Sequence, residues 1–360
     1  MRAPFDIVRE RLRNQALAGS RFRKADEVVA WLGAVQAQDY AGAKWALGLR
    51  ANRLTEAAVE RAFDAGEILR THVLRPTWHF VTPADIRWML ALSAPRVNAV
   101  NGFIYRQAGL DGKVFARSRA ALERALGGGR QLTRAELAQV LRRAGIHADG
   151  VRLAYLMMRA ELEAVICSGA RRGRQFTYAL LDERAPRART LGRDEALAEL
   201  TRRYFSSHGP ATVRDYVWWS GLTVADARTG IALATPALAQ RLIDGRTCWF
   251  VPSRSAAPLD SPSVHLLPNY DEYLVAYKDR DAVVGPSRPE GSRRSDVFTH
   301  SMLVNGLLAG SWRRSLAGRS IAVEVAPYGR LTAAGRRALA AAAERLGRFT
   351  SVDVELSIDG

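Results

Sequence analysis

Apolar residues recur at helical spacing in several stretches, and the clearest of them lies between residues 131 and 181. Thr133, followed three residues later by a glutamate, is typical of a helix start, and a second helix is predicted from Asp149 to Gly169. A basic turn at 171–174 and the alternating residues after it predict a β-hairpin. Two helices followed by a hairpin are typical of a winged helix, which is a helix-turn-helix unit with a strand hairpin attached.

Two further segments repeat this order of elements. Between residues 194 and 252, Thr212 and Thr223 each precede an aspartate by three positions, which predicts two short helices, and 248–251 is predicted to be a strand. The N-terminal segment is predicted to hold three helices and a β-like stretch, at 28–35, 44–49, 55–65 and 68–81. The chain is therefore predicted to contain three tandem winged-helix units.

The C-terminal part has a different pattern. Residues 253–296 are rich in proline, serine and aspartate. After them, strands are predicted at 297–303, 320–325 and 351–358, with an alanine-rich helix at 333–346. We predict an α+β fold in which the three winged helices are joined to a C-terminal β-barrel-like domain. The predicted domains are 1–115, 116–190, 191–255 and 256–360, and Gly127–Gly129 is interpreted as a hinge.

The net charge of the chain indicates what kind of partner it binds. The chain has 360 residues, with 53 Lys and Arg against 36 Asp and Glu, so its formal net charge is +17. This excess favours a polyanion such as nucleic acid as the partner. No run of eighteen apolar residues and no apolar leader is present, and the two cysteines form no CxxC pair. We therefore expect a cytoplasmic, nucleoid-associated protein without a membrane span or a disulfide framework.

Missing motifs exclude several enzyme classes. The sequence has no P-loop, no GxGxxG after a strand, no HExxH and no GxSxG. His72 and His79 would face opposite ways on a strand, so a shared metal is not expected. One alternative is a nuclease that uses the carboxylates between Asp271 and Asp279 together with Lys278.

Gln36-Ala37-Gln38 is the one short stretch that suggests chemistry, because it places two amides two residues apart at the end of an apolar helix. Positions i and i+2 of a helix do not share a face, so the two side chains act together only if the backbone leaves the helix near Ala37. Gly33 before the motif and Asp39 after it allow such an end. The residues alone favour the simpler interpretation, which is helix-end capping.

Three segments resemble the AlkZ/YcaQ family of winged-helix DNA glycosylases. Residues 36–38 match its Gln-apolar-Gln motif, 71–81 resemble its Arg-x-Thr-x-His-x-Val strand, and 268–280 resemble its Asp-Glu-Tyr…Tyr-Lys-Asp-Arg signature. A glutamine at position 38, where the YcaQ branch carries an acid, resembles the AlkZ branch. Pro76 departs from the family, whose members usually have a small residue there.

The resemblance implies three winged helices around a C-terminal β-barrel, which together form a basic concave surface for duplex DNA. It implies a monofunctional glycosylase that excises N7-alkylated purines, including bulky adducts and interstrand crosslinks, with no metal and no cofactor. Gln36 and Gln38 are then catalytic. DNA contacts are expected from Arg75, His79, Arg171, Arg172, Arg174, Lys278 and Arg280. General repair of alkylation damage and antibiotic self-resistance both stay open.

Two amides are sufficient for this chemistry on physical grounds. Alkylation at N7 makes the base cationic, so the base leaves neutral and no general acid is needed. A glutamine oxygen can then orient the attacking water. The main alternative is a transcriptional regulator that binds DNA without catalysis. Regulators of this kind usually dimerise, and three units in one chain favour a monomer instead.

Overall fold

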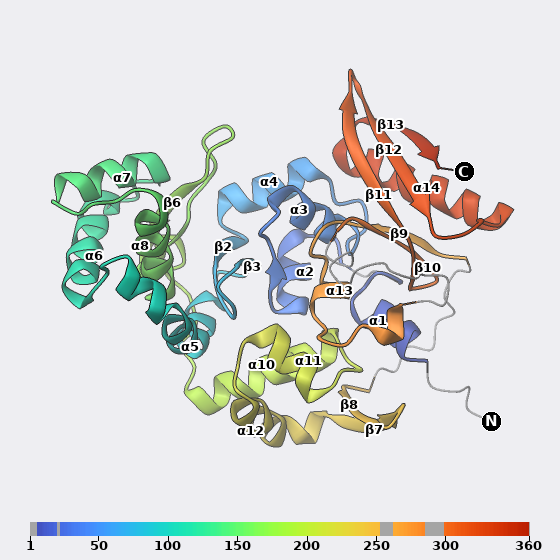
Figure 1. The fold of residues 1–360 in the computed structure, drawn as a ribbon, viewed down its shortest axis with the longest axis horizontal. Coiled ribbons are helices and arrows are strands. Elements are labelled where there is room, and N and C mark those ends of the chain that lie inside the picture. Colours follow the sequence, from blue (N-terminus) through green and yellow to red (C-terminus); the bar gives the residue numbers. More distant parts are fainter. Residues whose placement is uncertain (1–5, 20–21, 253–261, 285–298, 360) are drawn as a thin grey trace.

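The computed structural model describes residues 6–19, 22–252, 262–284 and 299–359 and has an α+β fold. Three largely helical groups lie beside a C-terminal sheet (Figure 1). Residues 253–261 and 285–296 of the proline- and serine-rich segment lie outside the described residues, as do the first two residues of the strand predicted at 297–303.

Four helices and a small antiparallel sheet form the N-terminal group. The helices are α1 (Ile7–Asn14), α2 (Ala25–Leu32), α3 (Tyr40–Gly48) and α4 (Glu56–Ala65). The sheet has the order β1 (Val35–Gln36), β3 (Trp78–Val81), β2 (Leu69–His72). The prediction of a helix through Val35 is wrong, because Gly33 adopts a φ of 84° that ends α2, and Val35 lies in β1.

The second group contains the predicted pair of helices and its hairpin. Its elements are α5 (Ile86–Gln107), α6 (Gly112–Leu126), β4 (Leu132–Thr133), α7 (Arg134–Arg143), α8 (Gly150–Leu162), β5 (Ile166–Ser168) and β6 (Thr177–Leu180). The sheet order is β4-β6-β5. The helix predicted to reach Gly169 is wrong in its last turn, because α8 ends at Leu162 and Ala164 adopts a positive φ of 56°. A short buried apolar run fits a helix or a strand equally well, so the pattern could not separate them.

The glycine run between α6 and β4 is held in place rather than free. The backbone N–H groups of Gly128 and Gly129 donate to the carboxylate of Glu183, at 2.9 and 2.6 Å. These contacts do not support a hinge at this point.

The third group follows the prediction closely. Its elements are α9 (Leu181–Arg184), α10 (Arg193–Ser207), α11 (Val213–Ser220), α12 (Val224–Ala234), η1 (Thr235–Ala237), β7 (Ala239–Ile243) and β8 (Arg246–Phe250). The side chains of Thr212 and Thr223 accept hydrogen bonds from the N–H groups of Asp215 and Asp226, as expected of these caps. Gly221 adopts a left-handed conformation between α11 and α12.

A curled half-barrel sheet of five strands forms the C-terminal part, in the order β13-β12-β11-β10-β9. Its elements are β9 (Val264–Leu267), α13 (Glu272–Val275), η2 (Asp281–Val283), β10 (Ser301–Val304), β11 (Leu307–Ala317), β12 (Ser320–Pro327), α14 (Ala333–Thr350) and β13 (Asp353–Ile358). The strands predicted near 320–325 and 351–358 and the alanine-rich helix are confirmed. Strands β9 and β11 were not predicted.

The hydrophobic cores cross the limits of the predicted domains. One core joins the N-terminal helices to the C-terminal sheet and α14. Within it, the rings of Trp45 and Phe349 lie 5.2 Å apart, and Trp45 Nε1 donates to the carbonyl oxygen of Leu266. A second core joins the β1-β3-β2 sheet to α5 and to the helices α10–α12. Residues far apart in the sequence therefore meet around that small sheet.

Candidate functional site

The Gln36-Ala37-Gln38 motif lies between two helices, with Gln36 as the last residue of β1 and Gln38 in a bend after it. Gly33 ends α2, and Asp39 begins α3 by accepting a hydrogen bond from Gly42 N–H at 3.0 Å. The backbone therefore leaves the helix before the motif, as a joint action of the two amides requires. Residues two apart on a strand point to the same face, but β1 ends at Gln36, so the strand fixes the face of Gln36 and not that of Gln38.

Two charged side chains hold the backbone of the motif from opposite directions. Gln36 N–H donates to Glu272 Oε1 at 2.8 Å, and Arg70 Nε donates to the Ala37 carbonyl oxygen at 3.0 Å. Ala37 N–H donates to the Trp78 carbonyl oxygen at 2.8 Å, so the ladder with β3 continues through the motif. The position of Gln36 is therefore fixed by hydrogen bonds to three separate segments.

The two amides lie at different depths. Gln36 is 8% exposed, whereas Gln38 is exposed. Gln38 thus lies at the rim of the sheet face, where a nucleotide could reach it, and Gln36 lies behind it.

A row of polar side chains crosses the small sheet behind the rim. Gln36 on β1 lies opposite His79 on β3, and His79 lies opposite Thr71 on β2. Directly opposed residues of antiparallel strands have side chains on the same face, about 4.5–5.5 Å apart at Cβ. His79 and Thr71 are fully buried. We call Gln36, His79 and Thr71 the polar row.

Each member of the polar row carries an unsatisfied polar atom. Among the described residues, Gln36 Oε1, His79 Nε2 and Thr71 Oγ1 have no hydrogen-bond partner. Buried polar atoms almost always have a partner in folded proteins, so three without one on the same face are unusual. Such an arrangement can bind a small polar group.

His79 is a neutral imidazole with a defined tautomer. Its Nδ1 lies 2.9 Å from the Thr77 carbonyl oxygen, which accepts the Nδ1 proton and leaves Nε2 as an acceptor. Burial lowers the pKa of His79 to about 4, and the positive charge of Arg75 lowers the pKa further than the negative charge of Glu272 raises it. A fully buried, neutral side chain does not suit the surface contact with DNA that was predicted for His79.

Glu272 is a buried anion that joins the motif to the third helical group. Its Oε2 accepts from Trp219 Nε1 at 2.9 Å and lies 3.5 Å from His208 Nε2. Burial by itself raises the pKa of Glu272, but His208 and the N–H of Gln36 outweigh it, so the pKa lies below its usual value. Glu272 was predicted only as part of the family signature at 268–280 or as a nuclease carboxylate, since no local signal points to a partner on β1.

The carboxylates of the 271–279 segment have separate structural partners. Asp271 forms two hydrogen bonds with the buried guanidinium of Arg50, at 2.7 and 2.8 Å, and Asp279 pairs with Arg246. Within the described ranges, no group of three or more His, Cys, Asp or Glu residues could hold a metal ion. The structure therefore does not bring these acids together as the nuclease alternative requires.

Two of the predicted DNA-binding residues lie at Trp218. Arg75 and Arg280 lie over the indole ring, with guanidinium carbons 5.7 and 5.9 Å from its centre. Lys278, two residues before Arg280, is exposed. Gly221 allows the loop before β3 to approach α11, because a Cβ at this glycine would lie 2.4 Å from the Leu74 carbonyl oxygen.

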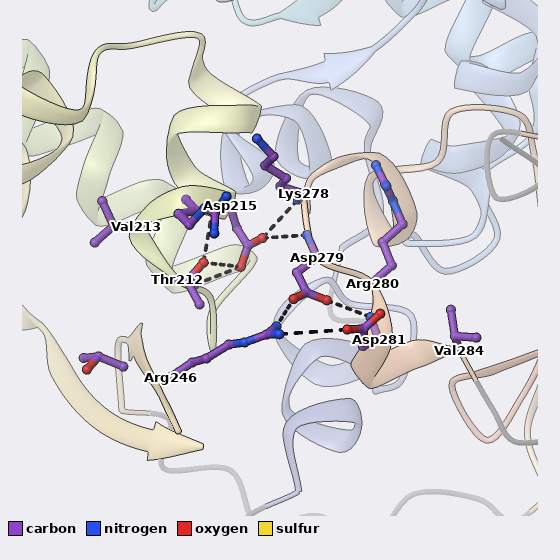
Figure 2. Close-up of a pocket in the computed structure, with 11 residues that line it drawn as sticks. Thr212, Val213, Asp215, Arg246, Lys278, Asp279, Arg280, Asp281 and Val284 are labelled. Carbon is purple, nitrogen blue, oxygen red and sulfur yellow. Dashed lines mark hydrogen bonds and ion pairs between the residues drawn. The ribbon is translucent and has the colours of Figure 1, made fainter. Parts of the chain in front are cut away.

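A pocket of about 600 Å³ adjoins this cluster (Figure 2). It is lined by Thr212, Val213, Arg214, Asp215, Arg246, Thr247, Lys278, Asp279, Arg280, Asp281 and Val284. Asp215 accepts from the backbone N–H groups of Lys278 and Asp279, at 3.0 and 3.1 Å. The pocket lining holds four basic and three acidic side chains, so its net charge is weakly positive.

The hairpin after β5 carries Arg171, Arg172 and Arg174, but the three differ in their contacts. Arg171 is largely buried, pairs with Glu60 at 3.4 Å and donates its backbone N–H to Asp64. Arg172 pairs with Glu136 at 2.8 Å but is half exposed. Arg174 is exposed. Arg172 and Arg174 are therefore the more exposed of the three.

Arg70 was missed as a site residue by the sequence analysis. Its guanidinium lies 4.3 Å from the centre of the Trp78 ring and 4.6 Å from that of Phe176, between the first and second groups. Burial lowers its pKa to about 10. Arg70 directly precedes the segment 71–81 that resembles the family strand, but no sequence signal links it to Ala37.

Comparison with known proteins gives consistent results. A family model described as DNA glycosylase AlkZ-like matches residues 29–349. An interstrand DNA cross-link repair glycosylase of Streptomyces sahachiroi is 25% identical over 320 residues, which cover 84% of this chain and 85% of that protein. The solved structure of the Streptomyces sahachiroi DNA glycosylase AlkZ has a similar fold, with a TM-score of 0.80, 21% identity and full coverage of both chains.

In the described part of the chain, no helix is both long and apolar enough to span a membrane.

Proposed function

The chain belongs to the AlkZ-like DNA glycosylase family, and we propose that it excises N7-alkylated purines from duplex DNA by means of a water held at Gln36 and Gln38. The observation that carries this proposal is the geometry of the motif. The backbone leaves the helix before Gln36, and Glu272 and Arg70 hold the backbone of the motif through hydrogen bonds. A side chain held in this way can orient a water without having to reorganise during the reaction.

The reaction needs little from the protein beyond that water. An N7-alkylated purine is already cationic, so the glycosidic bond breaks with the base leaving as a neutral molecule. The sugar then develops positive charge at C1′, and the water attacks that carbon. An amide oxygen accepts a hydrogen bond from the water and directs its lone pair at the sugar.

Binding of the duplex is proposed to come from basic residues outside the motif. The net charge of +17 favours contact with phosphates, and such contacts release counterions from DNA. We propose that the three helical groups act as winged helices on the DNA and that the chain works as a monomer. Arg172, Arg174, Lys278 and Arg280 are the side chains best placed to contribute.

Bulky adducts and interstrand crosslinks are proposed as further substrates. The relative that is 25% identical is described as an interstrand crosslink repair glycosylase. The exposed position of Gln38 supports this proposal, because a base tethered to the opposite strand cannot be turned into a deep pocket. Catalytic side chains at an open rim can still reach its sugar.

Single-turnover excision of N7-methylguanine tests the proposed function. A labelled duplex with one such base is incubated with excess protein and EDTA, and abasic sites are cleaved with alkali. We expect release by the parent protein, and a rate lower by about ten- to a thousand-fold for Gln36→Ala and Gln38→Ala. Gln107→Ala, which removes an exposed glutamine at the end of α5, serves as the control and should retain the parent rate.

Three results would contradict parts of this proposal. Duplex binding without any release by the parent protein would support a regulator instead. Equal rates for the parent and both motif variants would leave the motif a purely structural element. Loss of duplex affinity together with activity would show that the glutamines hold the DNA and do not orient a water.

A further inference from the structure

The polar row offers a second acceptor for the attacking water beside Gln36. Gln36 Oε1 and His79 Nε2 lie on the same sheet face at directly opposed positions, and neither has a partner among the described residues. Both atoms are acceptors, so neither can satisfy the other. A group that donates two hydrogen bonds is the natural occupant between them, and water is the smallest such group.

We propose that His79 is a catalytic residue that accepts the proton of the attacking water through its Nε2. This inference rests on the proposed function and deepens it. The water donates one hydrogen bond to Gln36 Oε1 and one to His79 Nε2. Of its two lone pairs, one can accept from the Gln38 amide at the rim, and the other faces C1′ of the damaged nucleotide.

The step balances without any further reactant. The water oxygen forms a bond to C1′, and the bond between C1′ and N9 breaks with its electron pair passing to the cationic purine, which becomes neutral. The water proton moves to His79 Nε2 and gives an imidazolium, which later returns the proton to solvent. Neither glutamine can take this proton, because an amide is not protonated at neutral pH.

The surroundings of His79 suit a base. The Thr77 carbonyl oxygen holds the Nδ1 proton, so the lone pair is fixed on Nε2, toward the row. Glu272, a buried carboxylate on α13, acts on His79 through its charge and would stabilise the imidazolium once it forms. Arg75 and His72 are the other titratable groups that act on the ring, and burial together with Arg75 keeps it neutral before the reaction.

Thr71 completes the row behind His79. Its Oγ1 is buried and without a partner among the described residues, and it lies opposite His79 on the side away from Gln36. A hydroxyl both donates and accepts, so Thr71 can exchange hydrogen bonds with a water next to the imidazole. We assign it a positioning role only.

Two substitutions separate proton acceptance from mere contact. In His79→Asn the amide N–H can still reach the Thr77 carbonyl oxygen, but no group is left at the Nε2 position. In His79→Gln an amide stands near the Nε2 position and can contact the water without taking its proton. His265 gives a matched control, because it is also buried, bonds a backbone carbonyl through Nε2 and has an unpartnered Nδ1 within the described chain.

The experiment measures single-turnover excision of N7-methylguanine between pH 4.5 and 8, after subtraction of release without protein. We expect the excision rate of both His79 variants to fall by about 10²- to 10⁴-fold, which is the usual contribution of a general base to the rate. Their affinity for the duplex should be unchanged. The parent rate should be level above pH 5 and fall toward pH 4.5, since a protonated His79 cannot accept a proton. This fall should be absent from the residual activity of the variants, and His265→Gln should resemble the parent.

Several outcomes would overturn the inference and leave the proposed function intact. One is an excision rate equal to that of the parent protein for either His79 variant. A second is a parent-like rate for His79→Gln but not for His79→Asn, which would make His79 a positioning residue. A third is a loss in thermal stability that accounts for the loss in rate, while the variants keep the decrease in rate toward pH 4.5. If the parent protein releases no N7-methylguanine while it binds the duplex, the proposed function itself fails and the role of His79 falls with it.

Discussion

Replacement of Glu272 by glutamine should destabilise the site without changing the size of the side chain. Oε1 accepts from Gln36 N–H at 2.8 Å and Oε2 from Trp219 Nε1 at 2.9 Å, and the carboxylate is fully buried. An amide has one acceptor oxygen and one NH₂ donor. One of the two N–H groups would therefore face another donor in Glu272→Gln.

The expected loss follows from these two contacts. A buried N–H left without an acceptor costs about 1–3 kcal/mol, and the remaining hydrogen bond weakens by about 1 kcal/mol because its acceptor is no longer charged. Removal of the charge brings no gain in return, since the lowered pKa of Glu272 means that its surroundings stabilise the anion. We expect the free energy of unfolding to fall by about 2–4 kcal/mol, a large part of the 5–15 kcal/mol typical of a domain.

Urea unfolding at pH 7, followed by tryptophan fluorescence, measures this loss. Glu344→Gln is the control, because Glu344 is 71% exposed and its one ion pair, with Arg348, is 3.6 Å long. Such a pair contributes less than about 1 kcal/mol. A loss below about 1 kcal/mol in Glu272→Gln would refute the argument that this carboxylate anchors the strand of Gln36.

Three further predictions concern other parts of the molecule. Arg70→Lys removes the Nε donor to Ala37 and should slow excision about tenfold at unchanged duplex affinity, which corresponds to the loss of one hydrogen bond to a charged group; an unchanged single-turnover rate would contradict a role of this hydrogen bond in positioning the motif. Arg172→Ala with Arg174→Ala should reduce the slope of log affinity against log salt by about 1–2, whereas Arg171→Ala should leave it unchanged, as binding titrations at several salt concentrations would show. Asp85→Asn should cost about 2 kcal/mol at pH 7, because burial raises the pKa of Asp85 but two arginines outweigh it and lower the pKa to about 2. A depressed pKa gives stability that is present above the unfolded pKa near 4 and lost as the pH falls toward 2, so the difference from the parent in urea unfolding should shrink below pH 4.

Elements that depend on neighbouring residues were predictable from the sequence. The caps at Thr133, Thr212 and Thr223 join residues three apart, and each begins a helix in the structure. The end of α8 was not predictable, because Ile166 and Cys167 are buried on a strand and continue the apolar pattern of the helix before them. Local chemistry decides where helices begin, and tertiary contacts decide where an apolar run changes from helix to strand.

The residues of the candidate site could be proposed from the sequence, but the contacts that hold them in place could not. Gln36 and Gln38 were proposed because residues 36–38 match the Gln-apolar-Gln motif of the family, whereas the residues alone favoured helix-end capping. The contact between Gln36 and Glu272 joins residues 236 positions apart, and no pattern of either segment indicates it. The polar row was equally hidden, since it depends on the register of β1, β3 and β2.

The different depths of the two glutamines imply different roles in orienting a water. Gln36 is 8% exposed, and its neighbouring backbone groups are held by Glu272, Arg70 and the β3 ladder, so its oxygen has a defined position before DNA arrives. Gln38 is exposed and lies beyond the last residue of β1, so its amide becomes fixed only when a nucleotide covers it. Electrostatic and hydrogen-bonding groups accelerate a reaction most when they need no reorganisation. The loss in rate should therefore be larger for Gln36→Ala than for Gln38→Ala, and a variant that loosens the backbone of Gln36 should reduce this difference.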